Sequence, residues 1–132
     1  MSNDEAKNRA SIDAFWQAWN EERLDDAIAL YAPDARLRHF THGIDVTGTK
    51  SIRDLMAMSL ATIPGRRSDL SAVFSVGDHV ITENRFHGTM ADSGQPVTNN
   101  ICYIFQLSME RLSNSASMGR PYGPATRPPR AV

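Results

Sequence analysis

The sequence predicts an α+β protein in which helices cover one side of a curved, mostly antiparallel sheet. Two observations lead to this class. Apolar residues recur at helical spacing in three early segments, with one strand among them, and they alternate with polar residues through most of the second half. Such segregation of helices from strands is typical of α+β folds. With 132 residues, of which 41% are hydrophobic, the chain can bury one core.

Each of the three helical segments carries one apolar stripe. The first covers residues 4–20 and begins with an acidic cap. The second covers residues 24–31 and is stopped by Pro33, which cannot continue a helix. The third covers residues 52–60 and is closed by the Pro-Gly pair at 64–65. We therefore expect three helices before the main run of strands.

The predicted strands are marked by apolar residues at every second position. An early strand covers residues 35–41, and another covers residues 70–76. Residues 79–90 and 96–107 then form a long hairpin around a turn signal at 92–94. These strands are expected to form the curved sheet on which the helices pack.

Composition and charge exclude several classes of function. The formal net charge is -1, from 14 basic and 15 acidic residues, so no general positive field exists for nucleic acid. The single cysteine, Cys102, excludes an intrachain disulfide and a cysteine-clustered zinc site. No apolar run approaches the ~18 residues of a membrane span, and the polar N-terminus lacks the apolar stretch of a signal peptide. We expect a cytoplasmic protein with no nucleic-acid or membrane partner.

No motif in the sequence predicts a cofactor or a metal ion. The chain has neither a glycine-rich phosphate loop nor a serine-nucleophile elbow. His39 and His42 lie close together in the sequence, but no further Asp or His is expected to converge on them. We therefore expect no metal site.

Five short motifs resemble, in the same order, those of the nuclear transport factor 2-like superfamily. They are FWQAW at 15–19, LDDAIALYAPDA at 24–35, GTKSIR at 48–53, RFHGT at 85–89 and YIFQL at 103–107. The nearest branch is that of the SnoaL-like polyketide cyclases, with ketosteroid isomerases and limonene epoxide hydrolases more distant. The resemblance covers residues 10–107. It implies a cone-shaped α+β barrel with three N-terminal helices packed on the sheet, a deep apolar pocket and a homodimer.

The end of the chain departs from that family. The family ends with a strand that begins Asp-Gly-Lys-Ile, whereas residues 108–119 read SMERLSNSASMG. Taking the third base of each codon with the first two of the next forces Gly at residues 109–110 and again at 118–119, and permits the family's strand between them. We therefore divide the chain into a domain at 1–107 and a tail at 108–132.

Two interpretations of this tail stay open. It is either frame-shifted relative to the family's last strand or genuinely divergent. A frame shift predicts that the barrel lacks one strand, which leaves an unpaired edge and exposed core. Residues 119–132 contain four prolines and three arginines, a composition typical of a disordered basic tail.

Two residues are candidates for proton transfer. In a gap-free alignment His39 falls on the general-base carboxylate of the ketosteroid isomerases, and strand parity places it with Leu37 on the apolar face. An imidazole with a pKa of about 6.5 is a workable base at neutral pH. Tyr103 falls on the acid/base Asp of the polyketide cyclases, where a phenol can donate a hydrogen bond or anchor an oxygen. The alternative is that both are hydrogen-bonded structural residues.

Three departures from the relatives narrow the chemistry. Phe15 falls where the isomerases carry their oxyanion-binding Tyr, and Phe cannot donate a hydrogen bond, so steroid isomerisation is disfavoured. Asn84 and Phe86 fall where the epoxide hydrolases carry Arg and Asp. Epoxide opening is therefore disfavoured as well.

Strand parity predicts which residues reach the pocket. A two-residue turn at Ser93-Gly94 would place Asn84 opposite Tyr103 and Phe86 opposite Ile101, whereas a three-residue loop would exchange the faces. The predicted substrate-binding residues are Phe15, Trp16, Trp19, Met56, Asn84, Phe86 and Asn99. The residues expected to form an outer or dimer-facing charged row are Glu83, Arg85 and His87.

Two functions stay open from the sequence. The first is a SnoaL-like enzyme that binds a hydrophobic, aromatic polyketide-like carbonyl compound in a deep pocket and performs general acid/base chemistry on it. Such an enzyme would act as a cyclase, as an isomerase or in an accessory step of hydroxylation, with His39 and Tyr103 as its catalytic residues. The alternative is a non-catalytic ligand-binding or dimerisation module of the same fold, because carboxylates are missing at both of the family's known base positions.

Overall fold

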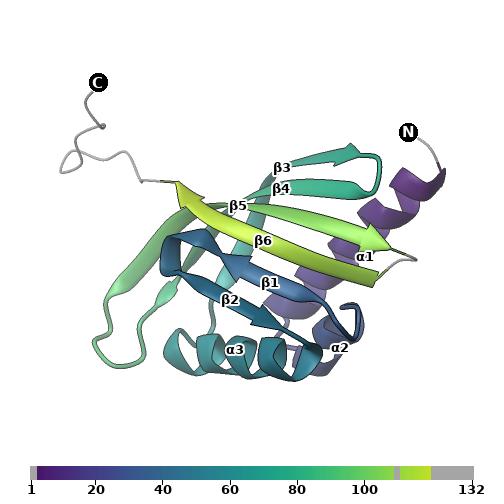
Figure 1. The fold of residues 1–132 in the computed structure, drawn as a ribbon. Helices are drawn as coiled ribbons and strands as arrows, with labels where there is room; N and C mark the ends of the chain where they lie inside the picture. Colours follow the sequence, from purple (N-terminus) through teal and green to yellow (C-terminus); the bar gives the residue numbers. More distant parts are fainter. Residues whose placement is uncertain (1–2, 109–110, 120–132) are drawn as a thin grey trace, which may run out of the picture.

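Six strands form one mixed sheet in the order β2-β1-β6-β5-β4-β3 (Figure 1). The computed structural model describes residues 3–108 and 111–119. The strands are β1 (Arg36–His39), β2 (Ile44–Thr47), β3 (Arg67–Val76), β4 (His79–Thr89), β5 (Pro96–Ser108) and β6 (Arg111–Gly119). Every pair of neighbours is antiparallel except β1 and β6, which run parallel.

The helices are α1 (Asn3–Asn20), α2 (Leu24–Ala29) and α3 (Thr49–Thr62), and a short 3-10 turn, η1, covers Phe40–His42. In Figure 1, α1 crosses behind the sheet, and α2 and α3 lie below it. The apolar stripe of α1 is buried against the sheet, where Phe15 and Trp16 join Val80, Phe105 and Leu107 in one core. The predicted helices and the α+β class are thus confirmed.

Two details of the predicted fold are corrected. The helices do not form one N-terminal set, because β1, η1 and β2 lie between α2 and α3. The sheet is not closed into a barrel either: within residues 3–108 and 111–119, β2 and β3 are its two edges. Sequence analysis missed β2, a strand of four residues that returns along β1 after a turn at Gly43. Gly43 has a φ of 66°, a conformation that residues with a side chain rarely adopt.

The chain beyond residue 107 contributes a strand to the middle of the sheet. β6 pairs with β5 from Ser108↔Arg111 to Asn100↔Gly119, and with β1 on its other side. The expectation of an unpaired edge on β5 is therefore wrong. The segment alternates after all: Leu112, Asn114 and Ala116 are buried at inward positions, with serines between them. Residues 120–132 of the predicted tail lie outside the described residues, and the frame shift stays a prediction.

The hairpin of β4 and β5 has a longer loop than expected. Thr89 pairs with Pro96, and the Met90 amide donates to the Gln95 carbonyl, so residues 91–94 form the loop. Relative to a two-residue turn, the register moves by two positions, which preserves the faces of both strands. The predicted cross-strand partners are thus corrected. The observed pairs are Asn84 with Ile101, Phe86 with Asn99 and Thr82 with Tyr103.

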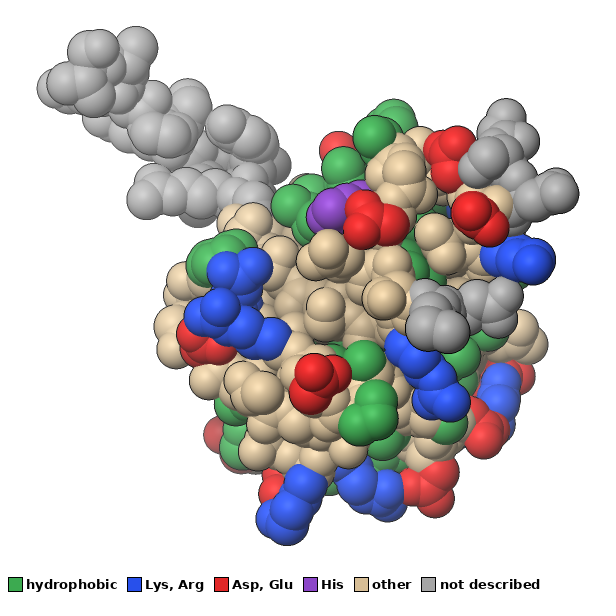
Figure 2. Space-filling view, turned by 45° about the vertical axis from the view of Figure 1, so that its right-hand side comes forward, with side chains coloured by type: hydrophobic (Ala, Val, Ile, Leu, Met, Phe, Trp, Pro, Cys, Tyr) green, Lys and Arg blue, Asp and Glu red, His purple; other side chains and the backbone are tan. Residues whose placement is uncertain are grey.

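The outer face of the sheet carries the predicted charged row. Glu83, Arg85 and His87 lie on β4 at positions that alternate with its buried residues. The surface in Figure 2 has a largely uncharged centre with charged side chains around it. Among the helices that the structure describes, none is long and apolar enough to cross a membrane.

The placement of β6 is testable by substitution. Leu112 is 0% exposed, so Leu112→Ala should lower the free energy of unfolding by about 2–5 kcal/mol, as buried leucines generally do. The matched control is Ser117→Ala at an exposed position of the same strand, with an expected change below about 0.5 kcal/mol. Urea denaturation of both variants measures the difference, and a silent Leu112→Ala would contradict the buried strand.

Candidate functional site

A cavity of about 330 Å³ lies between the inner face of the sheet and helices α1 and α3. Its volume is at the lower end of the range usual for small-molecule pockets, roughly 300–1,000 Å³. The predicted site residues that border it are Phe15, Trp16, Trp19, His39, Met56, Phe86, Asn99 and Tyr103. Asn84 is the predicted residue that does not border it. The cavity is thus open to one small molecule, with a wall drawn from both ends of the sequence.

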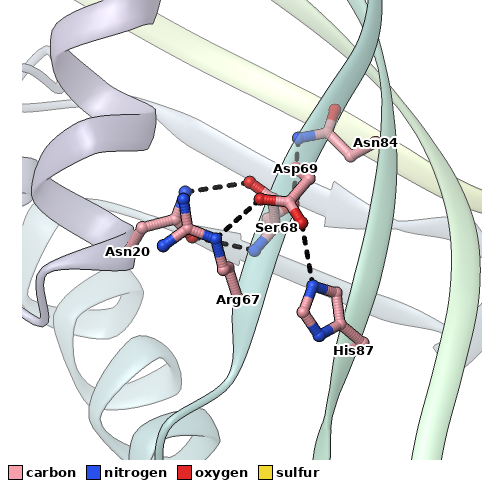
Figure 3. A network of polar contacts seen from close by, with 6 residues as sticks. All are labelled: Asn20, Arg67, Ser68, Asp69, Asn84 and His87. Atoms are coloured by element: carbon pink, nitrogen blue, oxygen red, sulfur yellow. Dashed lines mark hydrogen bonds and ion pairs between the residues drawn. The ribbon is translucent and has the colours of Figure 1, made fainter.

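Asn84 belongs instead to a buried polar network (Figure 3). Its Nδ2 donates to Ser68 Oγ at 2.9 Å, and its Oδ1 accepts from Thr82 Oγ1 at 2.7 Å. The Asn20 side chain in turn donates to the Ser68 carbonyl at 2.9 Å and accepts from the Ser68 amide at 2.8 Å. With its amide group engaged in this way, Asn84 helps to fix the end of α1 to β3 and β4.

The charged row on β4 forms part of a separate surface network (Figure 3). His87 Nε2 lies 2.9 Å from Asp69 Oδ2, and Arg67 Nε donates to Asp69 Oδ1 at 2.7 Å. His87 and Arg67 lower the pKa of the Asp69 carboxyl, His87 more strongly. These groups are exposed on the outer face and do not reach the cavity.

Aromatic side chains from α1 and β5 form one wall of the cavity. Trp16 packs edge-on against Tyr103 with ring centroids 4.7 Å apart, and Phe15 packs edge-on against Trp16 at 5.1 Å. Phe105 stacks behind Tyr103 at 6.0 Å. Such edge-to-face sets contribute stability beyond the area they bury, and they fix the orientation of each ring. The wall is therefore apolar and firmly packed.

The phenol of Tyr103 is suited to donate a hydrogen bond rather than to accept a proton. Burial raises the pKa of Tyr103 well above its ordinary value, although the positive charge of Arg66 opposes this rise. The hydroxyl makes no hydrogen bond to another residue that the structure describes. Tyr31 differs in this respect: its hydroxyl donates to Asn114 Oδ1 at 2.8 Å, and both residues border the cavity.

His39 and His42 form a pair at the β1–η1 end of the cavity. Their ring centroids are 4.5 Å apart with a tilt of 37°, and both border the cavity. Burial lowers the pKa of His39, and the nearby His42 lowers it further. Its Nδ1 is buried with no hydrogen-bond partner among residues 3–108 and 111–119. At neutral pH His39 is therefore a neutral imidazole that can accept a proton.

Local backbone geometry explains why the two rings meet. η1 turns the chain directly after β1, and the Gly43 amide donates to the Phe40 carbonyl at 3.4 Å. Thr41 Oγ1 accepts a hydrogen bond from the Met118 amide at 2.9 Å, which fixes the turn to β6. Sequence analysis considered His42 only together with His39 as a metal site and did not select it as a catalytic or binding residue.

A buried arginine lies behind the aromatic wall, and sequence analysis missed it. The Arg66 guanidinium stacks on Trp19, 3.7 Å from the ring centroid, and donates to the Trp19 carbonyl at 2.9 Å. Burial lowers the pKa of Arg66 to about 10, so it stays charged at neutral pH. Gly88 allows the backbone at Arg66 to pack closely against β4. A Cβ at residue 88 would lie 2.5 Å from Ile63 Cγ2 and 3.2 Å from Arg66 Cα, so a larger residue would displace the chain there.

The cavity wall contains no carboxylate among the residues that the structure describes. The described segments also contain no group of three or more His, Cys, Asp or Glu side chains that could hold a metal ion. Proton transfer at this site would therefore depend on His39, His42 and the two tyrosines. What the arrangement offers is a neutral base and a phenol donor in an apolar enclosure.

Comparison with known proteins shows what the chain is similar to. Residues 12–113 match the sequence profile of the SnoaL-like domain. No curated protein matches the chain significantly. Among solved structures, a candidate SnoaL-like polyketide cyclase from Jannaschia sp. CCS1 superposes with a TM-score of 0.80 at 18% identity, covering 90% of this chain and 88% of that one.

Two further solved structures have other descriptions. AclR, a candidate hydroxylase from Streptomyces galilaeus, has a TM-score of 0.75 at 16% identity and covers 86% of this chain and 76% of its own. A protein of ketosteroid isomerase-like fold from Catenulispora acidiphila, in complex with trimethylamine, has a TM-score of 0.74 at 20% identity and covers 83% and 84%. At sequence identities of 16% to 20%, these structural similarities show that the chain shares the fold of the three proteins.

The influence of His42 on His39 is measurable by NMR. His42→Gln removes a like charge, so the pKa of His39 should rise, while burial still holds it below the ordinary value. Titration of the imidazole Cε1–H resonances measures the change. His79→Gln, at the far end of β4, is the control that should leave the His39 titration unchanged. An unchanged titration in His42→Gln would contradict the observed pairing of the rings.

Proposed function

The chain belongs to the SnoaL-like domain family, and on that premise we propose that it is an enzyme acting on a small hydrophobic carbonyl compound of the aromatic polyketide type. The observation that carries the proposal is a neutral, half-buried His39 in an aromatic cavity whose described wall has no carboxylate. In this proposal His39 is the general base, and Tyr103 donates a hydrogen bond to the substrate oxygen.

The chemistry follows from the two side chains. His39 would accept a proton from a carbon next to the carbonyl group, which forms an enolate. The Tyr103 hydroxyl, kept protonated by its raised pKa, would stabilise the developing negative charge on oxygen. His39 would then return the proton at another position, or the enolate carbon would attack a second carbonyl of the substrate and His39 would return its proton to the alkoxide formed there. These outcomes correspond to isomerisation and cyclisation, and an accessory role in hydroxylation would be limited to forming the same enolate for attack by a separate oxidant such as O2.

The composition of the cavity wall supports a flat hydrophobic substrate. Trp16, Trp19 and Phe86 border it, and aromatic rings favour stacked or edge-on contact with another ring system. Asn99 borders it too and could orient a second oxygen of the substrate. The alternative, a non-catalytic ligand-binding module, is favoured by one observation: the family's base positions carry His39 and Tyr103 in place of carboxylates.

The proposal includes the expected homodimer. Phe74, Val76 and Ile104 are exposed on the outer face of the sheet, and Ile81 lies between Phe74 and Ile104 in the pairing of β3, β4 and β5. An apolar strip of this kind is typical of a protein–protein contact. Sedimentation equilibrium should give about twice the 14.6 kDa mass of one chain, and the mass of a single chain would contradict the dimer.

Proton exchange tests the enzyme directly. With 2-tetralone in D2O, the wild-type protein should accelerate exchange of the hydrogens next to the carbonyl, measured by NMR. His39→Asn should slow this exchange by about 100-fold to 10,000-fold, the usual contribution of a general base. His79→Asn should leave it unchanged. Tyr103→Phe should slow exchange because it removes the donor to the enolate oxygen.

Binding is measured in parallel through the two tryptophans, Trp16 and Trp19, which both border the cavity. Quenching of their fluorescence should give similar affinities for the wild type and for His39→Asn. If the variant binds the ketone and exchanges its protons at the wild-type rate, His39 is not the base. Binding without any accelerated exchange in the wild type would favour the ligand-binding module.

A further inference from the structure

Asn114, on β6, is a buried amide on the cavity wall with one of its two ends unpaired. Its side chain borders the cavity, and the residue is only 8% exposed. Its Oδ1 accepts a hydrogen bond from the Tyr31 hydroxyl at 2.8 Å. Its Nδ2 makes no hydrogen bond to a residue that the structure describes, yet protein atoms do not enclose it. Because buried polar groups normally have partners, an unpaired Nδ2 at a cavity indicates a ligand.

Tyr31 determines which end of the amide faces the cavity. Burial raises the pKa of Tyr31 well above its ordinary value, and the nearby Tyr103 raises it further, so the hydroxyl keeps its proton. Within the described part of the chain, Asn114 Oδ1 is the acceptor for that proton. Turning the amide by 180° would leave the buried Tyr31 proton without an acceptor. The oxygen therefore points to Tyr31, and the two N–H donors point away from it.

The register of the sheet places Asn114 beside Tyr103 and His39. β6 lies between β1 and β5 (Figure 1). Ala116 pairs with His39 on one side and with Tyr103 on the other. Asn114 is the next inward residue of β6, so Tyr103 and Asn114 are diagonal neighbours on adjacent strands. At this spacing, roughly 7–8 Å, aromatic and long side chains still reach each other.

The small side chain of Ala116 leaves space between these groups. Ala116 is buried and borders the cavity, with the imidazole of His39 on the neighbouring strand to one side and the phenol of Tyr103 to the other. The Tyr103 hydroxyl also has no hydrogen-bond partner among the described residues. Two donors without partners therefore lie on adjacent strands of the cavity wall, and the proposed base lies across Ala116 from one of them.

We propose that Asn114 is a further catalytic residue. Its Nδ2 and the Tyr103 hydroxyl together bind the carbonyl oxygen of the substrate, and Tyr31 is the positioning residue that orients the amide. This inference rests on the proposed function, since it completes the oxygen-binding part of the same site. Two donors share the negative charge that develops on an enolate oxygen, which one donor would carry alone. Asn114 thus supplies a donor in a chain where Phe15 cannot donate one.

Two ligands of the same shape isolate the contribution of the oxygen. 2-Naphthol carries its oxygen where 2-tetralone carries its carbonyl and resembles the enol, whereas 2-methylnaphthalene has a methyl group there. In equilibrium dialysis with the full chain, 2-naphthol should bind at least about ten-fold more tightly. Asn114→Leu should reduce this ratio by about three-fold to ten-fold, as expected for one hydrogen bond. The hydrocarbon should bind at least as tightly as before, which reports on the integrity of the cavity.

Asn100→Leu is the matched control. It makes the same change at an exposed position of β5, where the side chain alternates with the inward residues Asn99 and Ile101. The ratio of the two affinities should therefore stay at the wild-type value. The same variant should also exchange the protons of 2-tetralone at the wild-type rate.

Proton exchange on 2-tetralone should respond more strongly than binding. Asn114→Leu should slow exchange by about 100-fold, the usual loss when one donor to an oxyanion is removed. Ketone binding should weaken by less than about ten-fold, because the hydrogen bond strengthens only as negative charge develops on the oxygen. A purely structural asparagine would change the amount of folded protein but not the exchange rate of each folded site.

Tyr31→Phe tests the orienting hydrogen bond. The variant should slow exchange by about ten-fold, because the amide of Asn114 is then able to turn its oxygen toward the cavity. In the Asn114→Leu background, Tyr31→Phe should cause no further loss of exchange, since the group that it orients is already absent. The double variant also leaves no buried hydroxyl without a partner, which favours its folding.

The outcomes separate this inference from the proposed function. Wild-type exchange and an unchanged preference for 2-naphthol in Asn114→Leu would overturn the role of Asn114 and leave the general base intact. An equal loss from Tyr31→Phe in both backgrounds would overturn the positioning role of Tyr31. If the wild type prefers 2-naphthol through Asn114 but accelerates no exchange, the proposed enzyme fails and the oxygen-binding pair stands. Absence of binding by both ligands would overturn both proposals.

Discussion

The packing of α1 on the inner face of β5 is the contact on which both the core and the cavity depend. Phe15 and Trp16 meet Tyr103 and Phe105 in one edge-to-face set, so a single group of rings stabilises the fold and forms the cavity wall. In many proteins the core and the site can vary separately. Here a change of ring size at Trp16 alters the stability and the shape of the cavity together.

The polar side chains that could take part in chemistry lie at the ends of this apolar cavity. At the β1–η1 end, a short turn brings two imidazoles together, and burial with like charge keeps His39 neutral. Behind the opposite part of the wall, Arg66 is buried against Trp19 while Tyr103 keeps its proton. A base without a proton and a donor with one are the two states that acid–base chemistry on a ketone requires. Burial, rather than a carboxylate partner, sets the protonation states of His39 and Tyr103.

Much of this arrangement was predictable from the sequence, because long periodic segments indicate their own structure. The stripe of α1 and the alternation of β1 and β5 place Phe15, His39 and Tyr103 on inward faces, where they border the cavity. The predicted faces of β4 and β5 are correct even though the loop between these strands is longer than expected, because a register change of two positions leaves each side chain on the same face of the sheet.

Other features depend on information that a local pattern does not carry. β2 alternates over only four residues, IDVT at 44–47, which is too short a pattern to stand out beside the neighbouring turn, and η1 ends at the positive φ of Gly43. β6 alternates between Leu, Asn, Ala or Met and Ser, so its contrast is one of size rather than of hydrophobicity. From the sequence alone, Arg66 is an ordinary surface arginine. Its burial depends on stacking against Trp19, which is distant in the sequence.

The parallel pairing of β1 with β6 has a consequence for how the molecule assembles. β1 is joined to the rest of the sheet through β6, with His39 beside Ala116, although more than half of the chain separates them. During synthesis the other described elements leave the ribosome before β6 does. β1, which carries His39, therefore cannot pair with β6 until almost the whole chain has been made. Closing so long a loop is slow and entropically unfavourable. The hairpin of β4 and β5 can form from local contacts, whereas the half of the cavity that carries His39 is complete only once β6 has paired with β1.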